Sequence, residues 1–415
     1  MTRFNPGNRE QHIPQILICL GILLPLLCSF PTTAYNEQAG TKLGIDILLE
    51  KKIDVLKGKS IGLITNQTGC NSELLSTIDL LHKHPELNLI ALFAPEHGIR
   101  GKIKAGQSIQ SCHDKRTGLP VYSLYGKTKR PTDKMLRGID VLLFDIQDIG
   151  VRWYTYISTM AIAMEEAGKR GIEFIVLDRP NPFGGLKIEG PVLGKHQRSF
   201  IGRYPIPVVH GMTAGELALF YQGEFKVPVT LEVVLMEGWN RSMVWNDTGL
   251  TWIPTSPNIP TLESAFVYPG MGLVGETGLV SIGIGSTLPF QIASAPWISP
   301  QVLAKQMNDK HLPGVIFELV SISAGRKKRT GVHIQVTDSR GFMPLSTALH
   351  LLEAIRNLYP DRFISFFKQN NFDKYLGSSA MSKALKKGEN IEPVLQEWQQ
   401  EIEKFREKRK QYLLY

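Results

Sequence analysis

Residues 141–177 read VLLFDIQDIGVRWYTYISTMAIAMEEAGKRGIEFIVL, and this stretch decides the fold. It opens on a continuous apolar run, residues 141–144, and closes on another, residues 174–177. Between them, residues 157–169 carry apolar side chains at helical spacing, and Gly171 marks the end of the predicted helix. Short apolar strands joined by a helix are typical of a parallel sheet that is buried on both faces.

The same pattern occurs earlier in the chain. Residues 60–65 (SIGLIT) and 89–94 (LIALFA) are further predicted strands, and residues 72–83 between them have a helical period. These units predict an α/β protein with a Rossmann-like parallel sheet. The first strand is followed by Asn-Gln-Thr-Gly rather than a glycine-rich phosphate loop, so we expect no nucleotide and no other cofactor.

The C-terminal part predicts a smaller α/β domain. Residues 262–290 are rich in glycine and lack a helical period, which favours a loop-heavy junction. Beyond it we expect a strand over residues 331–337, an amphipathic helix over 344–358, and a last helix with one apolar face. The predicted domains therefore span residues 41–264 and 265–415.

The N-terminus predicts export. Arg3 and Arg9 precede an apolar run, residues 16–30, and the small residues 32–34 follow it. The run is too short to span a bilayer, so residues 1–34 are interpreted as a cleaved signal peptide. We expect a periplasmic or secreted protein with no membrane span after cleavage.

Composition narrows the classes of partner. The 415 residues carry a net charge of +9 with no long basic run, which argues against a nucleic-acid partner. After cleavage two cysteines remain, Cys70 and Cys112, which either form one disulfide or stay free.

Polar residues follow four successive predicted strands. In open parallel sheets, ligands bind beyond the carboxyl ends of the strands, so these residues form a predicted site. They are Asn66, Glu96, His97, Arg100, Asp145, Gln147, Asp148, Arg152, Tyr154, Tyr156, Asp178, Arg179, Asn181, Glu189 and His210.

Carboxylates beside arginines and aromatic rings suit glycoside hydrolysis. That reaction needs one carboxylic acid to protonate the leaving oxygen and a second carboxylate to attack the sugar or activate water. Structural alternatives stay open: Asp145 can accept backbone N–H groups, Asp178 and Arg179 can form a buried ion pair, and the aromatic residues can belong to the core. His97 and His210 lack the spacing of a metal-binding pair, so no metal site is predicted.

The motifs resemble the exo-β-N-acetylmuramidase family NamZ along essentially all of the mature chain. The matching strings are APEHGIRG (94–101), FDIQDIGVRWYTY (144–156), LDRPNP (177–182), EGPVL (189–193), HGMTAGEL (210–217) and TSPNIP (255–260). The resemblance implies a hydrolase that releases N-acetylmuramic acid from the non-reducing ends of peptidoglycan fragments. It also implies a Rossmann-like domain, a smaller α/β domain, and an active site in the cleft between them.

The resemblance further implies roles for individual residues. Glu96 matches the glutamate of the family's Pro-Glu-His-Gly motif and is the expected general acid. The partner carboxylate is left open: Glu165 matches a recurrent family glutamate, whereas Asp148 and Glu189 are better placed at strand ends. The lactyl carboxylate of muramic acid needs a cation, and the candidates are Arg100, Arg152 and Arg179.

One string departs from the family pattern. The family's Glu-Gly-Thr and Gly-Arg-Gly-Thr stand here as Glu276-Thr277-Gly278 and Gly283-Ile284-Gly285-Ser286. Glu276 remains an expected substrate contact, but any contact made by the family arginine is lost at Ile284. Two alternatives follow: an impaired relative that only binds sugars or wall fragments, and a metal-dependent hydrolase that uses His97, His210 and Asp145.

Overall fold

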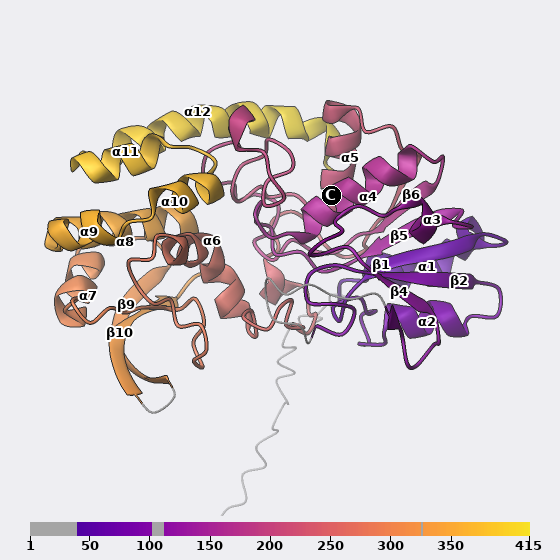
Figure 1. Cartoon of the computed structure of the whole chain (residues 1–415), viewed down its shortest axis with the longest axis horizontal. Coiled ribbons are helices and arrows are strands. Elements are labelled where there is room, and N and C mark those ends of the chain that lie inside the picture. The colour runs from indigo at the N-terminus through magenta and orange to yellow at the C-terminus, as the bar shows by residue number, and fades with distance from the viewer. Residues whose placement is uncertain (1–39, 102–111, 325–326) are drawn as a thin grey trace, which may run out of the picture. The chain divides into compact units, whose positions relative to one another are not determined.

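The computed structural model describes residues 40–101, 112–324 and 327–415 (Figure 1). Residues 39–415 belong to one compact unit. The predicted signal peptide, residues 1–34, lies outside the described ranges. Within those ranges, no helix combines the length and the apolar character needed to cross a membrane.

The N-terminal half is built on a seven-stranded sheet with the order β3-β4-β2-β1-β5-β6-β7, in which only β3 runs antiparallel to its neighbour. Its strands are β1 (Ser60–Thr65), β2 (Asn88–Ala94), β3 (Cys112–His113), β4 (Pro120–Ser123), β5 (Val141–Asp145), β6 (Glu173–Leu177) and β7 (Leu231–Val234). Its helices are α1 (Gly44–Lys51), α2 (Thr77–Lys83), α3 (Asp133–Leu136), α4 (Tyr156–Gly168) and α5 (Ala214–Phe225). The predicted Rossmann-like sheet is confirmed.

Each face of this sheet has its own core, because alternate residues of a strand point to opposite faces. Leu143 of β5 packs in the cluster that contains the buried residues of α1 and α2. Its neighbours Leu142 and Phe144 pack in the other cluster, with α4 and α5. A strand buried on both faces must be apolar at every position, which is why β5 is a continuous apolar run.

The helix predicted over residues 72–83 begins only at Thr77. The side chain of Asn71 accepts hydrogen bonds from the backbone N–H groups of Glu73 (3.2 Å) and Leu75 (2.8 Å), which offers the backbone an alternative to the helix. Leu74 lies in the left-handed region (φ 66°) and is half exposed. The apolar spacing therefore overestimated this helix by one turn.

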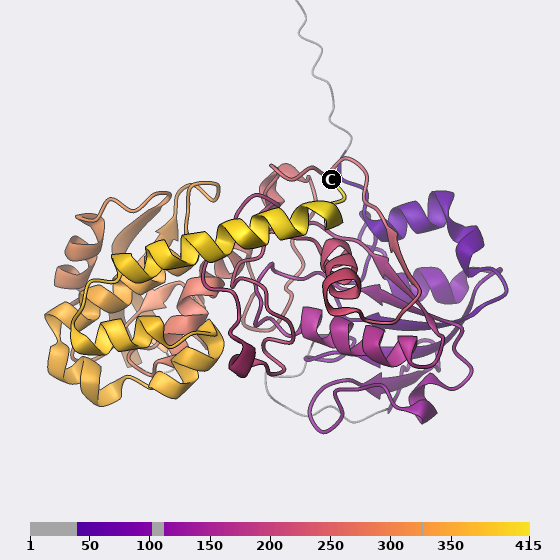
Figure 2. The same cartoon turned by 90° about the horizontal axis from the view of Figure 1, so that it is seen from above.

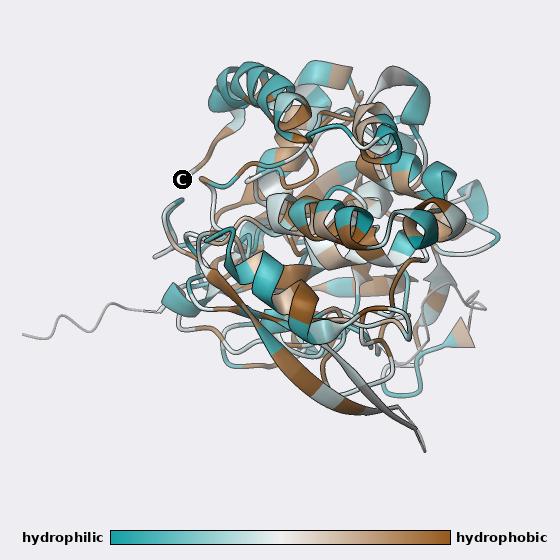
Figure 3. Cartoon of the chain, turned by 90° about the vertical axis from the view of Figure 1, so that its left-hand side faces the viewer, coloured by the Kyte–Doolittle hydropathy of each residue, from teal (hydrophilic) through white to brown (hydrophobic). Residues whose placement is uncertain are grey.

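The C-terminal half holds a three-stranded antiparallel sheet, β8-β10-β9, covered by helices. The strands are β8 (Ile292–Ala293), β9 (Val315–Ala324) and β10 (Lys327–Val336). The helices are α6 (Leu262–Glu276), α7 (Pro300–Asn308), α8 (Pro344–Leu358), α9 (Pro360–Phe366), α10 (Gln369–Leu376), α11 (Ala380–Lys387) and α12 (Glu392–Arg409). Figure 3 shows teal and brown residues side by side along these helices, as expected of elements with one buried side.

The loop-heavy junction expected over residues 262–290 is wrong, because its first half is the helix α6. Ten of its fifteen residues are buried, so the helix has no polar face and no amphipathic period. A Cβ atom at Gly270 would stand 2.1 Å from the carbonyl oxygen of Pro344, so the glycine permits the close approach of α8. The predicted domain boundary at residues 264 and 265 falls in the first turn of α6.

The last helix, α12, extends from the C-terminal half to α5 (Figure 2). Phe405 packs its ring 5.5 Å from that of Phe220 on α5, and Lys408 forms an ion pair with Glu224 (3.0 Å). The final residue, Tyr415, donates a hydrogen bond from its hydroxyl to Asp178 Oδ2 (2.8 Å), at the carboxyl end of β6. The end of the chain is thereby anchored to the N-terminal sheet.

Candidate active site

The crevice between the carboxyl ends of β1 and β5, where the strand order reverses, is filled by a loop of residues 254–256. Gln67 Nε2 donates a hydrogen bond to the carbonyl oxygen of Thr255 (3.1 Å). The hydroxyls of Tyr154 and Tyr156 donate to the side chain (2.8 Å) and the carbonyl (2.6 Å) of Thr255. Both tyrosines are buried and hold this loop, which fits the alternative that they are core aromatics.

Arg179 forms a buried ion pair, but with Asp145 rather than Asp178. Its Nε lies 2.6 Å from Asp145 Oδ1, and its Nη2 donates to the carbonyl oxygen of Cys70 (2.6 Å). The other oxygen of Asp145 accepts from the Thr77 hydroxyl (2.5 Å). Arg179 is therefore occupied and buried, and it does not serve as the expected cation for a substrate carboxylate.

Glu96 follows β2 in a strained turn. His97 is buried and has a φ of +72°, in the left-handed region that residues other than glycine rarely adopt. Such strain is retained where the surrounding structure holds it, often at functional sites. Glu96 is half-buried, and its Oε2 accepts a hydrogen bond from the Thr155 hydroxyl (2.9 Å) at the start of α4.

Tyr125 lies on the other side of Glu96, just after β4. Burial raises the pKa of the Tyr125 hydroxyl, and the charge of Glu96 and its hydrogen bond with that hydroxyl raise the pKa further. Thr155 and Tyr125, both from the N-terminal half, thus place hydroxyl groups beside the Glu96 carboxylate.

The C-terminal half meets this site through two tyrosines that contact the segment containing Thr155. The ring of Trp153 lies 5.9 Å from that of Tyr375 on α10, and the ring of Tyr154 lies 5.7 Å from that of Tyr268 on α6. The three contacts of this segment are made by consecutive residues, Trp153, Tyr154 and Thr155, and the contact of Thr155 is its hydrogen bond to Glu96. Glu96 therefore faces tyrosines of the other half.

Glu276, the last residue of α6, lies beside the same two tyrosines. Burial raises the pKa of Tyr375, the charge and hydrogen bond of Glu276 raise it further, and so does the charge of Glu96. The pKa of Tyr268 is also raised, by burial first and then by Tyr154, Tyr375, Glu96 and Glu276. Asn371 Nδ2 donates to Glu276 Oε2 (3.4 Å). Two carboxylates, one from each half, thus flank the same pair of phenols.

Arg152 joins the two halves through its guanidinium group. Its side chain is 1% exposed. The guanidinium donates to the carbonyl oxygens of Pro191 (2.8 Å) and Ile206 (2.8 Å) in one half, and of Tyr375 (3.0 Å) and Leu376 (2.6 Å) in the other. Burial lowers the pKa of Arg152 to about 9. The expected role in binding a substrate carboxylate is replaced by a structural one.

Asp148 is buried and is not placed to act on a substrate. Its Oδ2 accepts from the Gly150 N–H (2.6 Å) and lies 3.9 Å from His210 Nε2. Burial raises the pKa of Asp148 to about 7 and lowers that of His210 to about 3, with Arg409 and Arg152 lowering the latter further. His210 is fully buried and neutral, and its Nδ1 accepts from the Met212 N–H (3.3 Å).

Glu189 caps a helix. Its two carboxylate oxygens accept from the N–H groups of Leu345 (3.2 Å) and Ser346 (3.2 Å), in the first turn of α8. Carboxylates stabilise this end of a helix, where N–H groups have no partner within the helix. Burial raises the pKa of Glu189 to about 7. The strand-end argument did not anticipate this capping role of Glu189.

The predicted amide side chains stabilise loops. Asn66 Oδ1 accepts from the backbone N–H (2.9 Å) and the hydroxyl (2.6 Å) of Thr68. Gln147 Nε2 donates to two carbonyls, including that of Pro180 (2.7 Å). Asn181 Nδ2 donates to the carbonyl of Met212 (3.0 Å). Of these three, Asn66 also lies beside Tyr156.

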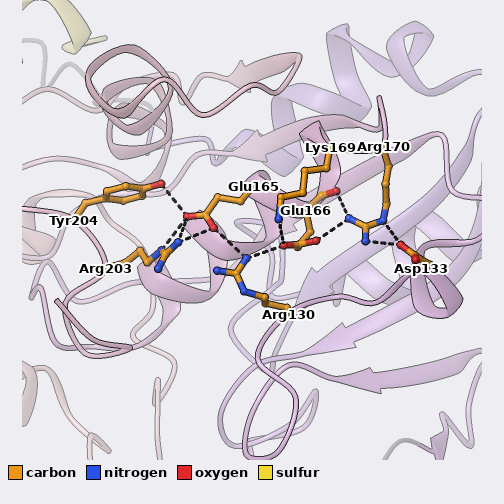
Figure 4. A network of polar contacts seen from close by, with 8 residues as sticks. All are labelled: Arg130, Asp133, Glu165, Glu166, Lys169, Arg170, Arg203 and Tyr204. Atoms are coloured by element: carbon orange, nitrogen blue, oxygen red, sulfur yellow. Dashed lines mark hydrogen bonds and ion pairs between the residues drawn. The ribbon is translucent and has the colours of Figure 1, made fainter.

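Glu165 belongs to a surface ion-pair network (Figure 4). It binds Arg203 (2.6 Å), Arg130 (3.1 Å) and the Tyr204 hydroxyl (2.9 Å). Glu165 is ten residues along α4 from Thr155, a rise of about 15 Å, while Glu96 is hydrogen-bonded to Thr155. Paired carboxyls of glycosidases stand about 5–9.5 Å apart, so Glu165 is too far away to be the partner of Glu96.

Arg100 is the remaining predicted cation. Its Nη2 lies 2.9 Å from Asp114 Oδ1, and its side chain is 35% exposed.

Ile284, which stands in place of the family arginine, is half exposed in a turn between two glycines with positive φ. Cys70 and Cys112 are both free thiols. In the described ranges, no group of three histidine, cysteine or acidic side chains could hold a metal ion.

Several site residues had no usable signal in the sequence. Tyr125 follows β4, a four-residue strand that begins with a proline and does not stand out as an apolar run. Thr155 stood inside a quoted motif but has no charge that would have drawn attention. Tyr268 and Tyr375 lie on helices more than 100 residues beyond Glu96 along the chain, and only the packing of the two halves brings them there.

Two family models match the chain: exo-β-N-acetylmuramidase NamZ, N-terminal, over residues 61–263, and exo-β-N-acetylmuramidase NamZ, C-terminal, over residues 266–415. A curated relative, the peptidoglycan β-N-acetylmuramidase NamZ of Bacillus subtilis strain 168, is 46% identical over 384 residues. This alignment covers 91% of the chain and 92% of the relative.

Two crystal structures of DUF1343 family proteins from Bacteroides fragilis NCTC 9343 share the fold. One has a TM-score of 0.85 at 44% identity, and the other a TM-score of 0.72 at 28% identity. Each comparison covers 90% of this chain and 99% of the other.

Proposed function

The chain belongs to the exo-β-N-acetylmuramidase NamZ family, and we propose that it hydrolyses the β-glycosidic bond of N-acetylmuramic acid at the non-reducing ends of peptidoglycan fragments. The observation that carries this proposal is the placement of Glu96, half-buried in a strained turn and facing tyrosines of both halves. Glycosidases use a carboxylic acid to protonate the leaving oxygen, and Glu96 is the carboxyl group that the fold brings beside both halves.

Glu96 acts in this proposal as the general acid. Its carboxyl group gives a proton to the glycosidic oxygen as the bond to the anomeric carbon breaks. Thr155 and Tyr125 hold the carboxyl group in place from two sides.

Arg100 is the proposed partner of the lactyl carboxylate. Arg152 and Arg179 are buried and bonded to protein groups, whereas Arg100 is partly exposed and four residues from Glu96. An arginine can bind a carboxylate through two parallel hydrogen bonds. Exchange of Arg100 for glutamine is expected to raise KM for a muramide but not for the same substrate with an amidated lactyl group.

The test of the acid role is the Glu96→Gln variant with a muramyl disaccharide as substrate. Loss of a general acid lowers kcat by about 10²–10⁴-fold. A decrease smaller than tenfold, with an unchanged melting temperature, contradicts the assignment. The same variant should lose less activity on an aryl muramide, because a good leaving group needs less help from an acid.

Export is part of this proposal, since peptidoglycan lies outside the cytoplasmic membrane. The support is the charged and apolar pattern of residues 1–34. N-terminal sequencing of the protein recovered outside the cytoplasm tests it, with a start near residue 35 expected; an intact N-terminus would contradict it.

A further inference from the structure

Glu276 stands at a position where it does not stabilise its own helix. It is the last residue of α6, a 15-residue helix, and the partial negative charge at the C-terminal end of a helix disfavours a carboxylate. Its contacts in the described part of the chain are with neutral groups, Asn371 and Tyr375 of α10. Among the residues that the structure describes, no cation forms an ion pair with Glu276.

The contacts of one short segment place Glu276 opposite Glu96. Thr155 holds Glu96 at 2.9 Å, and Trp153, two residues earlier, contacts Tyr375, which is hydrogen-bonded to Glu276. The charges of Glu96 and Glu276 both raise the pKa of Tyr268 and of Tyr375, so the two carboxylates lie around the same pair of phenols, one from each half.

The other candidate carboxylates are occupied elsewhere. Glu189 caps α8, Asp148 is buried against a backbone N–H and His210, and Glu165 is about 15 Å from Thr155 in an ion-pair network. Among the described acidic residues considered for this role, Glu276 alone combines partial exposure with a place beside the tyrosines that face Glu96.

We propose that Glu276 is the second carboxylate of the reaction, the general base that activates the attacking water. This inference rests on the proposed function. Glu96 gives its proton to the leaving oxygen, water oxygen forms the new bond to the anomeric carbon, and Glu276 takes the proton that this water loses. One water is consumed, one glycosidic bond breaks, and the product has the inverted configuration.

Tyr375 is a positioning residue in this arrangement. Its hydroxyl lies beside Glu276, whose charge raises the pKa of the phenol, and its main-chain carbonyl accepts from Arg152, which fixes the position of the residue. Tyr375→Phe is expected to lower kcat about tenfold with little change in KM, since the carboxylate stays but loses its orientation.

The decisive experiment compares Glu276→Ala, Glu276→Gln and Glu96→Gln on a muramyl disaccharide and on an aryl muramide. Both Glu276 variants should lose about 10²–10⁴-fold in kcat on both substrates, because water attack needs the base whatever the leaving group. Glu96→Gln should be more active on the aryl muramide than on the disaccharide. Azide should restore the activity of Glu276→Ala by forming a glycosyl azide, and it should not restore the activity of Glu96→Gln.

Controls separate the possible failures. Glu263→Gln makes the same exchange at the exposed start of α6 and should leave kcat unchanged. Glu276→Gln should melt no lower than the wild type, because it removes a charge that opposes the helix dipole. If Glu276→Ala unfolds, Glu276→Asp gives the same readout with a shortened side chain.

The inference is overturned if the Glu276 variants keep more than a tenth of the activity, or if NMR shows that the first product retains its configuration. Either result leaves the proposed function standing as long as the wild type cleaves the disaccharide. Retained activity in Glu96→Gln instead overturns the acid role of Glu96, and an inactive wild type overturns the proposed function.

Discussion

Replacement of Arg152 by methionine tests whether this residue holds the two halves together or binds substrate. Methionine has a similar length and keeps apolar packing but donates no hydrogen bonds. Four carbonyl oxygens, two in each half, then lose their donor. The largest effects are expected on stability and on the position of Tyr375.

The magnitude follows from two opposing contributions. Hydrogen bonds from a charged donor contribute about 1.5–3 kcal/mol each, so four contribute about 6–12 kcal/mol. Burial lowers the pKa of Arg152 to about 9, well below the usual value of a guanidinium, and this penalty on the charge corresponds to about 5 kcal/mol at about 1.4 kcal/mol per pKa unit. The expected net loss is about 4 kcal/mol.

Calorimetry measures this loss directly. For the unit of residues 39–415, an unfolding entropy of about 2.1 cal/mol/K per residue converts about 4 kcal/mol into a decrease of about 5 °C in Tm. Arg130→Met is the control, since Arg130 is 45% exposed and its ion pairs with Glu165 and Glu166 are worth less than about 1 kcal/mol.

Kinetics complete the assay. Because Arg152 bonds the carbonyl of Tyr375, its loss should lower kcat while the preference for a muramide over its lactyl amide stays unchanged. An unchanged Tm together with a loss of that preference would refute the structural role. It would instead assign the substrate carboxylate to Arg152.

Three further predictions concern residues outside the reacting pair. Glu165→Gln should lower Tm by breaking its contacts with Arg203 and the Tyr204 hydroxyl but change kcat less than threefold; a hundredfold loss would reinstate it as catalytic. Because burial raises the pKa of Asp148 to about 7, its contribution to stability is present below about pH 4 and is lost as the pH rises through 7. Asp148→Asn should therefore stabilise the protein by about 2–3 kcal/mol more at pH 8.5 than at pH 5 in urea titrations, and an equal effect at both values would contradict this. Gly270→Ala should lower Tm by several degrees, because the new Cβ would stand 2.1 Å from a carbonyl oxygen of α8; an unchanged Tm would show that the two helices separate at little cost.

The parallel sheet could be predicted because its strands are buried on both faces. Such strands must be apolar at every position, and β1, β2, β5 and β6 lie within one residue of the predicted runs. The helix α6 was missed because its partly exposed positions are mostly glycine and tyrosine rather than charged residues, so it has no amphipathic period, and its glycines and Pro269 resemble a loop. An amphipathic period identifies helices that have one charged face, and it misses helices such as α6 that lack one.

The site divides in the same way. Glu96 was predictable, because strand ends of a parallel sheet bring polar residues to one edge and a distinctive motif marks this one. Which of the neighbouring arginines and carboxylates remain available was decided only by tertiary contacts. Arg179 pairs with Asp145, Arg152 bonds the carbonyls of both halves, and the C-terminal half brings Glu276 and Tyr375 to the site of Glu96. Hydrogen-bond partners far apart in sequence leave no local pattern. The sequence alone therefore could not show which charged side chains are paired inside the protein and which remain available to a substrate.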